Sequence, residues 1–517
     1  MIAKSPAYEA AINANTRMTD FTAQFGFVPP GSVEGATLSS TSQASYAQLA
    51  QVKDGNSQMG AYWRNLNDWP LDGSTTLIDG TGQLGFWSSY LSNNNSTMAN
   101  STYVTYTLDT TYDLIGVTVY FDIPGNEYAT DFTVGYYNNS NTLLTSKTVS
   151  GNQSPQVVVE LIQTGVKSIR VTVSKWCLPN ARPRIAEIIP GQYYTFDLSN
   201  SFSLEINDII KPFSNSFETA DLTVEFDNSD HKFDFLNPGG VFSYLRQQMK
   251  IESQIGLNIG GVYDLTNSGT RYLYEIPSNE QLQTARLVSR PGVAFASADT
   301  DNLIGSFTIA TAAAELWGDT GLPQTCTIDA SLQSIACNQY IGENVSINDA
   351  LAALAITAGG YWFIDRDGNM ELRPIKTSLT SPVYTMTYDE MFDKPKITQN
   401  PKVTAVRIGY SYLDLSNNFK SKQTIYTNGA NDGTQVEAIS YFTPTTTRAE
   451  AIGQLVLDYH AARRLTFEIS YRGNPALEVG DIIEVETDYG YRNIEITEHT
   501  LILDGNGFLR GSLKGVG

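Results

Sequence analysis

The sequence predicts a mainly β fold with a small α/β portion. Short segments in which apolar and polar residues alternate recur along the chain, as in residues 220–226 and 168–173, with turn residues between them. Tyrosine occurs 29 times and aromatic residues make up 11% of the chain, a composition that favours strands. Capped helix patterns occur in two places. At 517 residues, the chain is long enough for about three to four domains.

Changes in the pattern divide the chain into five parts. Residues 1–60 are polar and predict one or two strands that pair with the sheet of residues 191–299. Residues 61–190 hold short alternating strands separated by Pro, Gly and Asn turns, and this spacing predicts an inserted β-sandwich of the jelly-roll type. Strands dominate residues 191–299, a helix and a hairpin fill 300–379, and 380–517 combine a second helix with strands.

The strand of residues 220–226 has the clearest alternation, because its even-numbered residues are apolar and its odd-numbered residues are polar. Ala220, Leu222, Val224 and Phe226 are therefore expected to face a core. The following sequence, Asp227-Asn-Ser-Asp230, predicts an Asx-type turn.

The two helices are predicted from their capping residues. Ser346 is the expected N-cap of the first, with Asp349 at the capping-box position and Gly359 at its end. Asp367-Gly368 then predicts a hairpin turn. For the second helix, Thr447 and Glu450 form the expected capping box.

Charge and cysteine content restrict the class of protein. The formal net charge is −21, opposite to that of proteins that bind the nucleic-acid backbone. Such a surface suits the wall of a conduit through which DNA slides, although many soluble β proteins are simply acidic. Cys177, Cys326 and Cys337 are an odd number without a CxxC pair, so we expect no disulfide framework and synthesis in the cytoplasm, a reducing compartment. No long apolar run predicts a membrane segment.

No motif predicts catalysis, a cofactor or a metal ion. His231, His460 and His499 are far apart and lack ligand spacing. Residues 365–371 have oxygen ligands at alternate positions, but Gly is fourth and not sixth, so a hairpin is favoured over a calcium loop. Asp227, Asp230 and Asp234 favour a solvated turn over a cation site. We therefore expect no enzyme, while a glycoside hydrolase with two carboxylates is left open.

One binding site is predicted in the inserted sandwich. Trp87, Trp176 and Arg182 fall at predicted strand ends or loops. Aromatic faces and a planar cation are the groups on which sugar rings stack and to which they bond. The three residues are thus candidates for glycan binding. The alternative is that both tryptophans fill the ends of the sandwich as core residues.

Several phrases resemble those of baseplate hub and tail-tip proteins of tailed bacteriophages and related particles. They are the strand and turn in residues 216–238, the helix with the Asp365-Arg-Asp-Gly hairpin, the phrase at 474–485 and the closing strands at 501–513. Together they cover residues 190–517. The resemblance implies two barrel-like β domains, at 191–299 and 380–517, on either side of the α/β domain at 300–379. Residues 61–190 are similar to galactose-binding-like domains.

The resemblance also implies a function. In hub proteins, three copies form a ring that closes the tail tube and connects it to a spike or tip. The expected partners are therefore two further copies, a tail-tube or distal tail protein, a spike or tip protein and a tape-measure protein, with DNA passing but not bound. The expected location is the tail of a virion or tail-like particle. The alternative is a carbohydrate-binding adhesin that contacts cell-surface glycan through residues 61–190.

Overall fold

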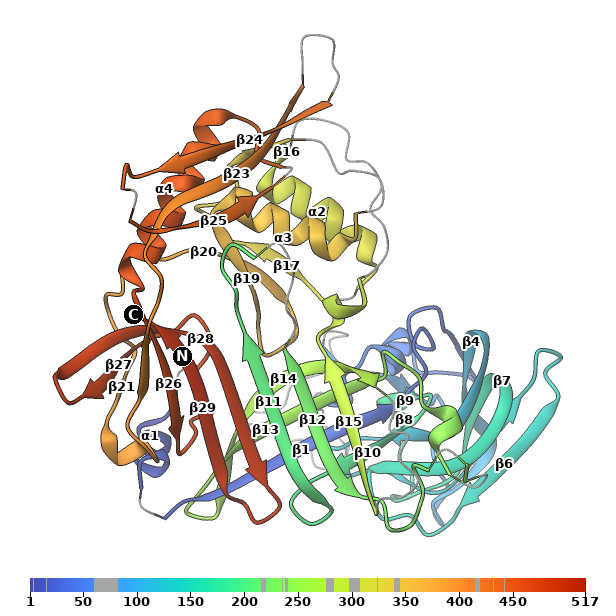
Figure 1. The fold of residues 1–517 in the computed structure, drawn as a ribbon. Helices are drawn as coiled ribbons and strands as arrows, with labels where there is room; N and C mark the ends of the chain where they lie inside the picture. Colours follow the sequence, from blue (N-terminus) through green and yellow to red (C-terminus); the bar gives the residue numbers. More distant parts are fainter. Residues whose placement is uncertain are drawn as a thin grey trace, which may run out of the picture. The chain divides into compact units, whose positions relative to one another are not determined.

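The computed structural model confirms that the chain is mainly β, with four α-helices among the residues that it describes (Figure 1). The described residues are 1–2, 4–14, 16–59, 82–214, 220–234, 236–237, 240–275, 283–296, 307–322, 324–338, 345–413, 419–430, 432–440 and 442–517. They form two compact units. The first unit comprises Met1–Ala23, Phe196–His231 and Ile251–Gly517, and the second comprises Gln24–Thr195 and Lys232–Lys250.

The second unit contains the predicted sandwich. Its strands are β2 (Thr37–Ser40), β3 (Phe86–Trp87), β4 (Thr97–Tyr120), β5 (Ala129–Tyr137), β6 (Leu143–Val149), β7 (Gln156–Trp176), β8 (Arg184–Ile185), β9 (Glu187–Ile189) and most of β10 (Gln192–Phe196). Five of them pair in the order β2-β4-β7-β5-β6, while β9 pairs with β4, and β3 with β8.

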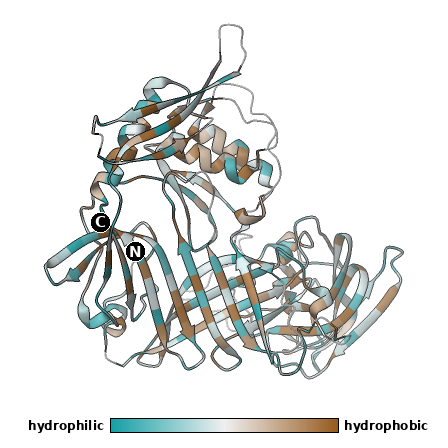
Figure 2. Cartoon of the chain, in the orientation of Figure 1, coloured by the Kyte–Doolittle hydropathy of each residue, from teal (hydrophilic) through white to brown (hydrophobic). Residues whose placement is uncertain are grey.

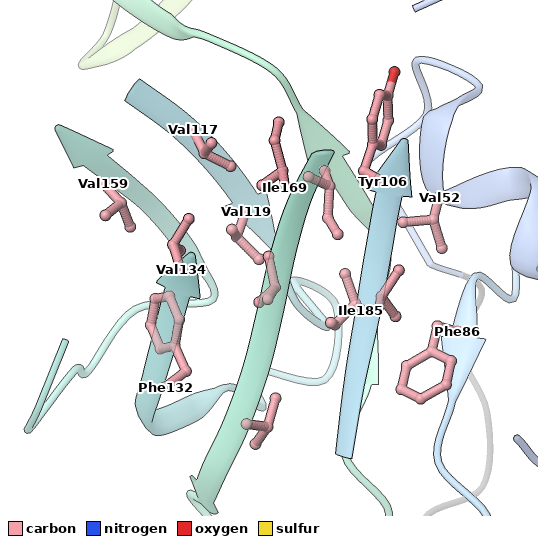
Figure 3. Close-up of a cluster of buried hydrophobic side chains, with 14 of the residues drawn as sticks. Val52, Phe86, Tyr106, Val117, Val119, Phe132, Val134, Val159, Ile169 and Ile185 are labelled. Carbon is pink, nitrogen blue, oxygen red and sulfur yellow. The ribbon is translucent and has the colours of Figure 1, made fainter. Parts of the chain in front are cut away.

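Two long strands, β4 and β7, build both layers of this sandwich. Their pairing register shifts several times between Thr107 and Gly116, so each strand bends and contributes its two halves to different layers. The halves enclose one apolar core, in which Val117 and Val119 lie across from Ile169 (Figure 3). Val52 is completely buried in the same core, and β2 pairs with β4. Residues 37–53 therefore belong to the sandwich, which corrects the prediction that residues 1–60 join the first barrel.

The first unit is built on a large sheet. Its strands are β11 (Ser201–Ile209), β12 (Asp221–Asp227), β13 (Lys250–Ile259), β14 (Val262–Glu275), β15 (Thr284–Arg290), β21 (Tyr384–Met386), β22 (Lys396–Gln399), β26 (Leu465–Tyr471), β27 (Ile482–Thr487), β28 (Gly490–Asp504) and β29 (Leu509–Val516). They pair in the order β13-β14-β15-β12-β11-β28-β29-β26-β22, with β27 also on β28 and β21 on β27. Strand β1 (Met18–Phe27) pairs with β13 and β10.

Strands β11 and β28 join the two predicted barrels into one sheet. They are antiparallel, with Leu204 opposite Leu503 and Ile206 opposite Leu501, and all four side chains are buried. Hydrophobic and hydrophilic residues alternate along these strands, as a half-buried sheet requires (Figure 2). Within the described residues the strand order is an open path and no barrel closes. The expectation of two separate barrels is corrected accordingly.

An α/β portion completes the first unit. It contains α2 (Ile309–Thr320), α3 (Ile347–Ala358), α4 (Thr446–Ala462), β16 (Phe307–Thr308), β17 (Cys326–Ile328), β18 (Ala336–Cys337), β19 (Gly360–Ile364), β20 (Met370–Pro374), β23 (Val403–Leu413), β24 (Phe419–Thr427) and β25 (Thr434–Ile439). A short helix, α1 (Pro6–Ile12), lies in the N-terminal segment. Helices α2 and α3 share a core, and α4 packs on β23.

The predicted caps and turns can be compared with the structure one by one. The hydroxyl of Ser346 accepts a hydrogen bond from the amide of Asp349 (3.2 Å), so the predicted cap of α3 is confirmed. Helix α4 is capped by Thr445, whose hydroxyl accepts from the amide of Arg448 (3.1 Å), and not by Thr447. Each of the three consecutive threonines, residues 445–447, could cap the helix. Because Thr445 is the cap in place of Thr447, the helix begins two residues earlier than predicted. Helix α2 was not predicted.

Both acidic turns are local hydrogen-bonded structures. A carboxylate oxygen of Asp227 accepts from the amide of Ser229 (2.9 Å). Asp365 accepts in the same way from the amides of Asp367 and Asn369, and Gly368 has a φ of 83° in the turn between β19 and β20. These contacts confirm the two predicted turns.

Candidate functional site

Trp176, one of the three predicted glycan-binding residues, ends β7 inside the sandwich core. Its side chain is 0% exposed, and its ring meets that of Phe121 edge to face at 5.8 Å. The indole N–H donates a hydrogen bond to a carboxylate oxygen of Glu127 (3.1 Å). Both ring faces are therefore covered by protein, and the stacking role predicted for Trp176 does not fit its burial.

Trp87, in β3, is also a core residue, with 5% of its surface exposed. Its indole N–H donates to the carbonyl oxygen of Leu84 (2.7 Å), and its ring packs edge to face on Tyr46. The guanidinium of Arg184 lies over the ring, 4.3 Å from its centre. The burial of both tryptophans supports the alternative that they fill the sandwich as core side chains.

Arg182 does not join the tryptophans. Its guanidinium donates to the carbonyl oxygens of Ser88 (3.1 Å) and Ser89 and so ties the segment after β7 to the segment after β3. The structure therefore does not bring the three predicted residues together as one open surface. Glycan binding by the sandwich stays a prediction.

A buried ion-pair cluster occupies this part of the sandwich instead. Arg184 is 4% exposed and forms ion pairs with Glu127 and with Asp122, the latter at 3.3 Å. Asp122 also accepts from the amide of Gly125 (2.8 Å), where a Cβ atom would lie only 2.1 Å from the carboxylate. The sequence analysis missed this cluster. The sequence feature that could have indicated the cluster is Arg184 between Pro183 and Ile185. A cation that is buried in an apolar segment requires carboxylates near it.

Another buried acid lies in β9, next to this cluster in the sequence. Glu187 is 3% exposed and accepts a hydrogen bond from the amide of Gly55 (2.8 Å). Burial raises the pKa of its carboxyl to about 7; the amide of Gly55 opposes this shift and the charge of Asp54 adds to it.

A second arginine lies on the opposite side of the β4-β7-β5 layer. Arg170 alternates with the buried Ile169 and Val171, so it points away from the core. Its guanidinium carbon lies 4.7 Å from the centre of the Tyr103 ring and 4.6 Å from that of Tyr137. The sequence analysis did not single out this group. The segment Ser168-Ile-Arg-Val-Thr could have indicated this group, because the alternation of apolar and polar residues places Arg170 on the polar face of the strand.

The first unit contains a cavity of about 500 Å³ with mainly apolar walls. Phe213, Val403, Val436 and Val516 contribute to it, together with His460. Burial and the charge of nearby Arg463 lower the pKa of this imidazole, which favours its neutral form. Lys211, Arg463 and Lys514 also line the cavity, so its walls combine apolar and cationic side chains.

The histidines and acidic residues form no metal cluster in the part of the chain that the structure describes. His499 is buried in the first unit, where its Nε2 lies 2.7 Å from the hydroxyl of Tyr471. No helix among the described residues is long and apolar enough to cross a membrane.

Comparison with protein families connects the first unit to phage tails. Residues 346–499 match the model of a family described as "Putative phage tail protein". The match begins at the N-cap of α3 and ends within β28, so it includes α3, α4 and part of the large sheet. Over these residues the match confirms the resemblance to phage tail proteins that the sequence motifs indicated.

Solved structures include two similar tail proteins. The tail protein from Neisseria meningitidis MC58 is 13% identical, with a TM-score of 0.44, over 63% of this chain and 93% of its own. The 43 kDa tail protein of prophage MuSo2 from Shewanella oneidensis is 13% identical, with a TM-score of 0.42, over 63% and 95%. The lectin domain of lectinolysin, complexed with Lewis B antigen, is 14% identical, with a TM-score of 0.23, over 31% and 96%. No curated protein matches significantly.

Proposed function

We propose that this chain is a structural component of a phage tail or tail-like particle, located at the baseplate hub or tail tip. The family match over residues 346–499 is the main support for the proposal. The motifs at residues 216–238 and 501–513 lie outside the matched range and support the proposal separately. The proposal includes no enzymatic activity.

In this proposal three copies form a ring that closes the tail tube and joins it to a spike or tip. Strand β22 supports a role in assembly, because it is the last strand of the large sheet and all four of its residues are exposed. Ile397 places an apolar side chain, 43% exposed, on this edge. An open strand edge can pair with a strand of another chain.

The charge of the chain supports the passage of DNA or a tape-measure protein through such a ring. With a formal charge of −21, the copies would repel phosphate groups and not bind them. DNA would then pass through the ring without adhering to it.

The proposal is tested with the purified full chain. We expect mass photometry to show a trimer and electron microscopy to show this trimer at one end of tail-tube assemblies. A chain that stays monomeric at micromolar concentration and does not attach to tubes would contradict the proposal.

A second candidate function is contact with cell-surface glycan through the sandwich. The Tyr103–Arg170–Tyr137 group favours it, because this group combines aromatic rings with a cation on an outward face. Trp87 and Trp176 supply no such surface.

A further inference from the structure

The outward face of the β2-β4-β7-β5-β6 sheet has an unusual composition. The pairing registers place on it the residues that alternate with the buried core residues of each strand. Apart from Arg170, the two tyrosines, Gly135 and Leu143, the paired positions around the arginine carry hydroxyl groups. They are Thr37, Ser39, Thr105, Thr107, Thr133, Ser146, Thr148, Ser168 and Thr172. No carboxylate occupies these positions.

Arg170 is fixed at the centre of this face. Its Nε–H donates to the hydroxyl of Thr105 (3.2 Å) and its Nη1 lies 3.5 Å from the hydroxyl of Tyr137. Thr105 and Ser168 beside it are each only 7% exposed, whereas Arg170 and both rings remain partly exposed. Two ring contacts and a hydrogen bond therefore hold the guanidinium in one orientation.

Part of the guanidinium has no protein partner. Among the residues that the structure describes, Arg170 forms no ion pair, and its Nη2 group has no hydrogen-bond acceptor. This is notable in a chain with 54 acidic and 33 basic residues. A guanidinium fork whose donors remain open matches a carboxylate, which can accept two parallel hydrogen bonds.

Gly135 contributes to the shape of the site. It lies opposite Arg170 on β5, and a Cβ atom there would be 3.2 Å from the ring of Tyr137 and from the side chain of Leu143. The absence of a side chain lets the Tyr137 ring lie close to the sheet. The group is therefore formed before any ligand arrives, which reduces the entropic cost of binding.

We infer that the group formed by Tyr103, Arg170 and Tyr137 is a binding subsite for a saccharide that carries a carboxylate. The guanidinium pairs with the carboxylate, the tyrosine rings contact the apolar face of the sugar, and the neighbouring threonine and serine hydroxyls bond to sugar hydroxyls. The inference rests on the second proposed function, contact with glycan through the sandwich, and gives it a ligand class and a location.

Nucleic acid does not fit this face. A polyanion binds through many cations. Among the described residues at the paired positions directly around the two tyrosines, Arg170 is the one cation. A single fixed cation with hydroxyls around it corresponds better to one acidic sugar unit.

The test uses pairs of ligands that differ only in charge. Binding of the full-length chain to sialyllactose and to an oligogalacturonate is measured by calorimetry, with lactose and the methyl-esterified oligogalacturonate as neutral counterparts. We expect binding of at least one acidic saccharide, at least tenfold weaker binding of its neutral counterpart, and weakening by salt.

Variants then locate the binding. Arg170→Gln should lower the affinity for the acidic saccharide at least tenfold, and Arg170→Lys should give an intermediate loss because it keeps the charge without the fork. Arg407→Gln is the matched control, because Arg407 is an exposed arginine of the first unit, paired with Glu437. It should bind as the wild type does. Equal melting temperatures of the variants exclude misfolding as the cause.

Each contrary result overturns the inference. The contrary results are three: the chain binds neither acidic saccharide, it binds the neutral counterparts as tightly as the acidic ones, or Arg170→Gln binds the acidic saccharide with the affinity of the wild type. Trimer formation and attachment to tail tubes are measured on the same Arg170→Gln protein. If both are normal while glycan binding is absent, only the glycan inference fails; if both fail in the wild type, the proposed hub function fails.

Discussion

Two regions of the sandwich, the β3-β8 pair and the outward face of the β4-β7-β5 sheet, use arginine in different ways. In the β3-β8 pair, Arg184 is enclosed by the Asp122 and Glu127 carboxylates and by the Trp87 ring, and 4% of it is exposed. On the outward face, Arg170 has ring contacts but no carboxylate partner within the described residues. Aromatic contact alone therefore does not distinguish a cation that is paired within the protein from one that is not. The presence or absence of a protein anion does.

The largest effect is expected when Arg184 is removed. Arg184→Leu leaves two buried carboxylates without their cation, which should lower the free energy of unfolding by about 3–5 kcal/mol. Urea denaturation followed by tryptophan fluorescence measures this change. Arg182→Leu is the control, because it removes hydrogen bonds to two backbone carbonyls only and should cost about 1–2 kcal/mol. Equal costs for the two variants would contradict the structural role of the Arg184 cluster.

Glu187 tests how a buried acid behaves when its carboxylate accepts a hydrogen bond from a backbone amide and forms no ion pair with any residue that the structure describes. Its raised pKa, about 7 against 4.5 for the free group, means that the folded state binds the proton more tightly. The stabilisation is fully present below pH 4.5 and is lost as the pH rises through 7, a change of about 3 kcal/mol.

Glu187→Gln keeps an acceptor for the amide of Gly55 and cannot ionise. We expect the variant to lack this decline in stability, so that it exceeds the wild type most clearly at pH 8. Melting temperatures of both proteins between pH 4.5 and 8 provide the measurement. Parallel curves for the two proteins would show that Glu187 does not titrate in this range.

A smaller effect is expected for Trp176→Phe. The substitution keeps an aromatic ring against Phe121 but removes the indole N–H that donates to Glu127. Loss of a buried hydrogen bond to a charged group should cost about 2 kcal/mol. Urea denaturation measures it, and binding to any saccharide should be unchanged. A variant that loses glycan binding while retaining its stability would instead restore the stacking role predicted from the sequence.

The smallest effect on stability is expected for Arg170→Gln. Because Arg170 is partly exposed and forms no ion pair within the described part of the chain, its replacement should change the free energy of unfolding by less than about 0.5 kcal/mol. Urea denaturation of Arg170→Gln and Arg184→Leu side by side measures the difference between the two arginines directly. A decrease in the free energy of unfolding above about 2 kcal/mol would show that Arg170 stabilises the sandwich.

Local features of this fold could be predicted from the sequence. The cap at Ser346, the turn after Asp227 and the hairpin at Gly368 depend on residues within a few positions of one another. The strand alternation at Ile169 and Val171 likewise follows from residues that are adjacent in the chain. Such signals also gave the mainly β class.

Features that depend on distant pairing could not be predicted. Strands β11 and β28 join residues almost 300 positions apart, and neither sequence indicates that the two predicted barrels share a sheet. The burial of Trp176 depends on a carboxylate from a different segment, Glu127. The sequence around a tryptophan at a strand end does not show whether its ring faces water or the core, so the burial of Trp87 and Trp176 could not be predicted.

The pairing of β1 with β10 has an evolutionary consequence. The chain leaves the large sheet along β1, passes through β2 to β9, and returns along β10 as the immediate neighbour of β1. A segment whose two ends lie side by side can be shortened or exchanged by recombination while the strands that flank it keep their partners. The length and sequence of residues 37–189 can therefore change while β1 keeps its pairing with β13 in the large sheet.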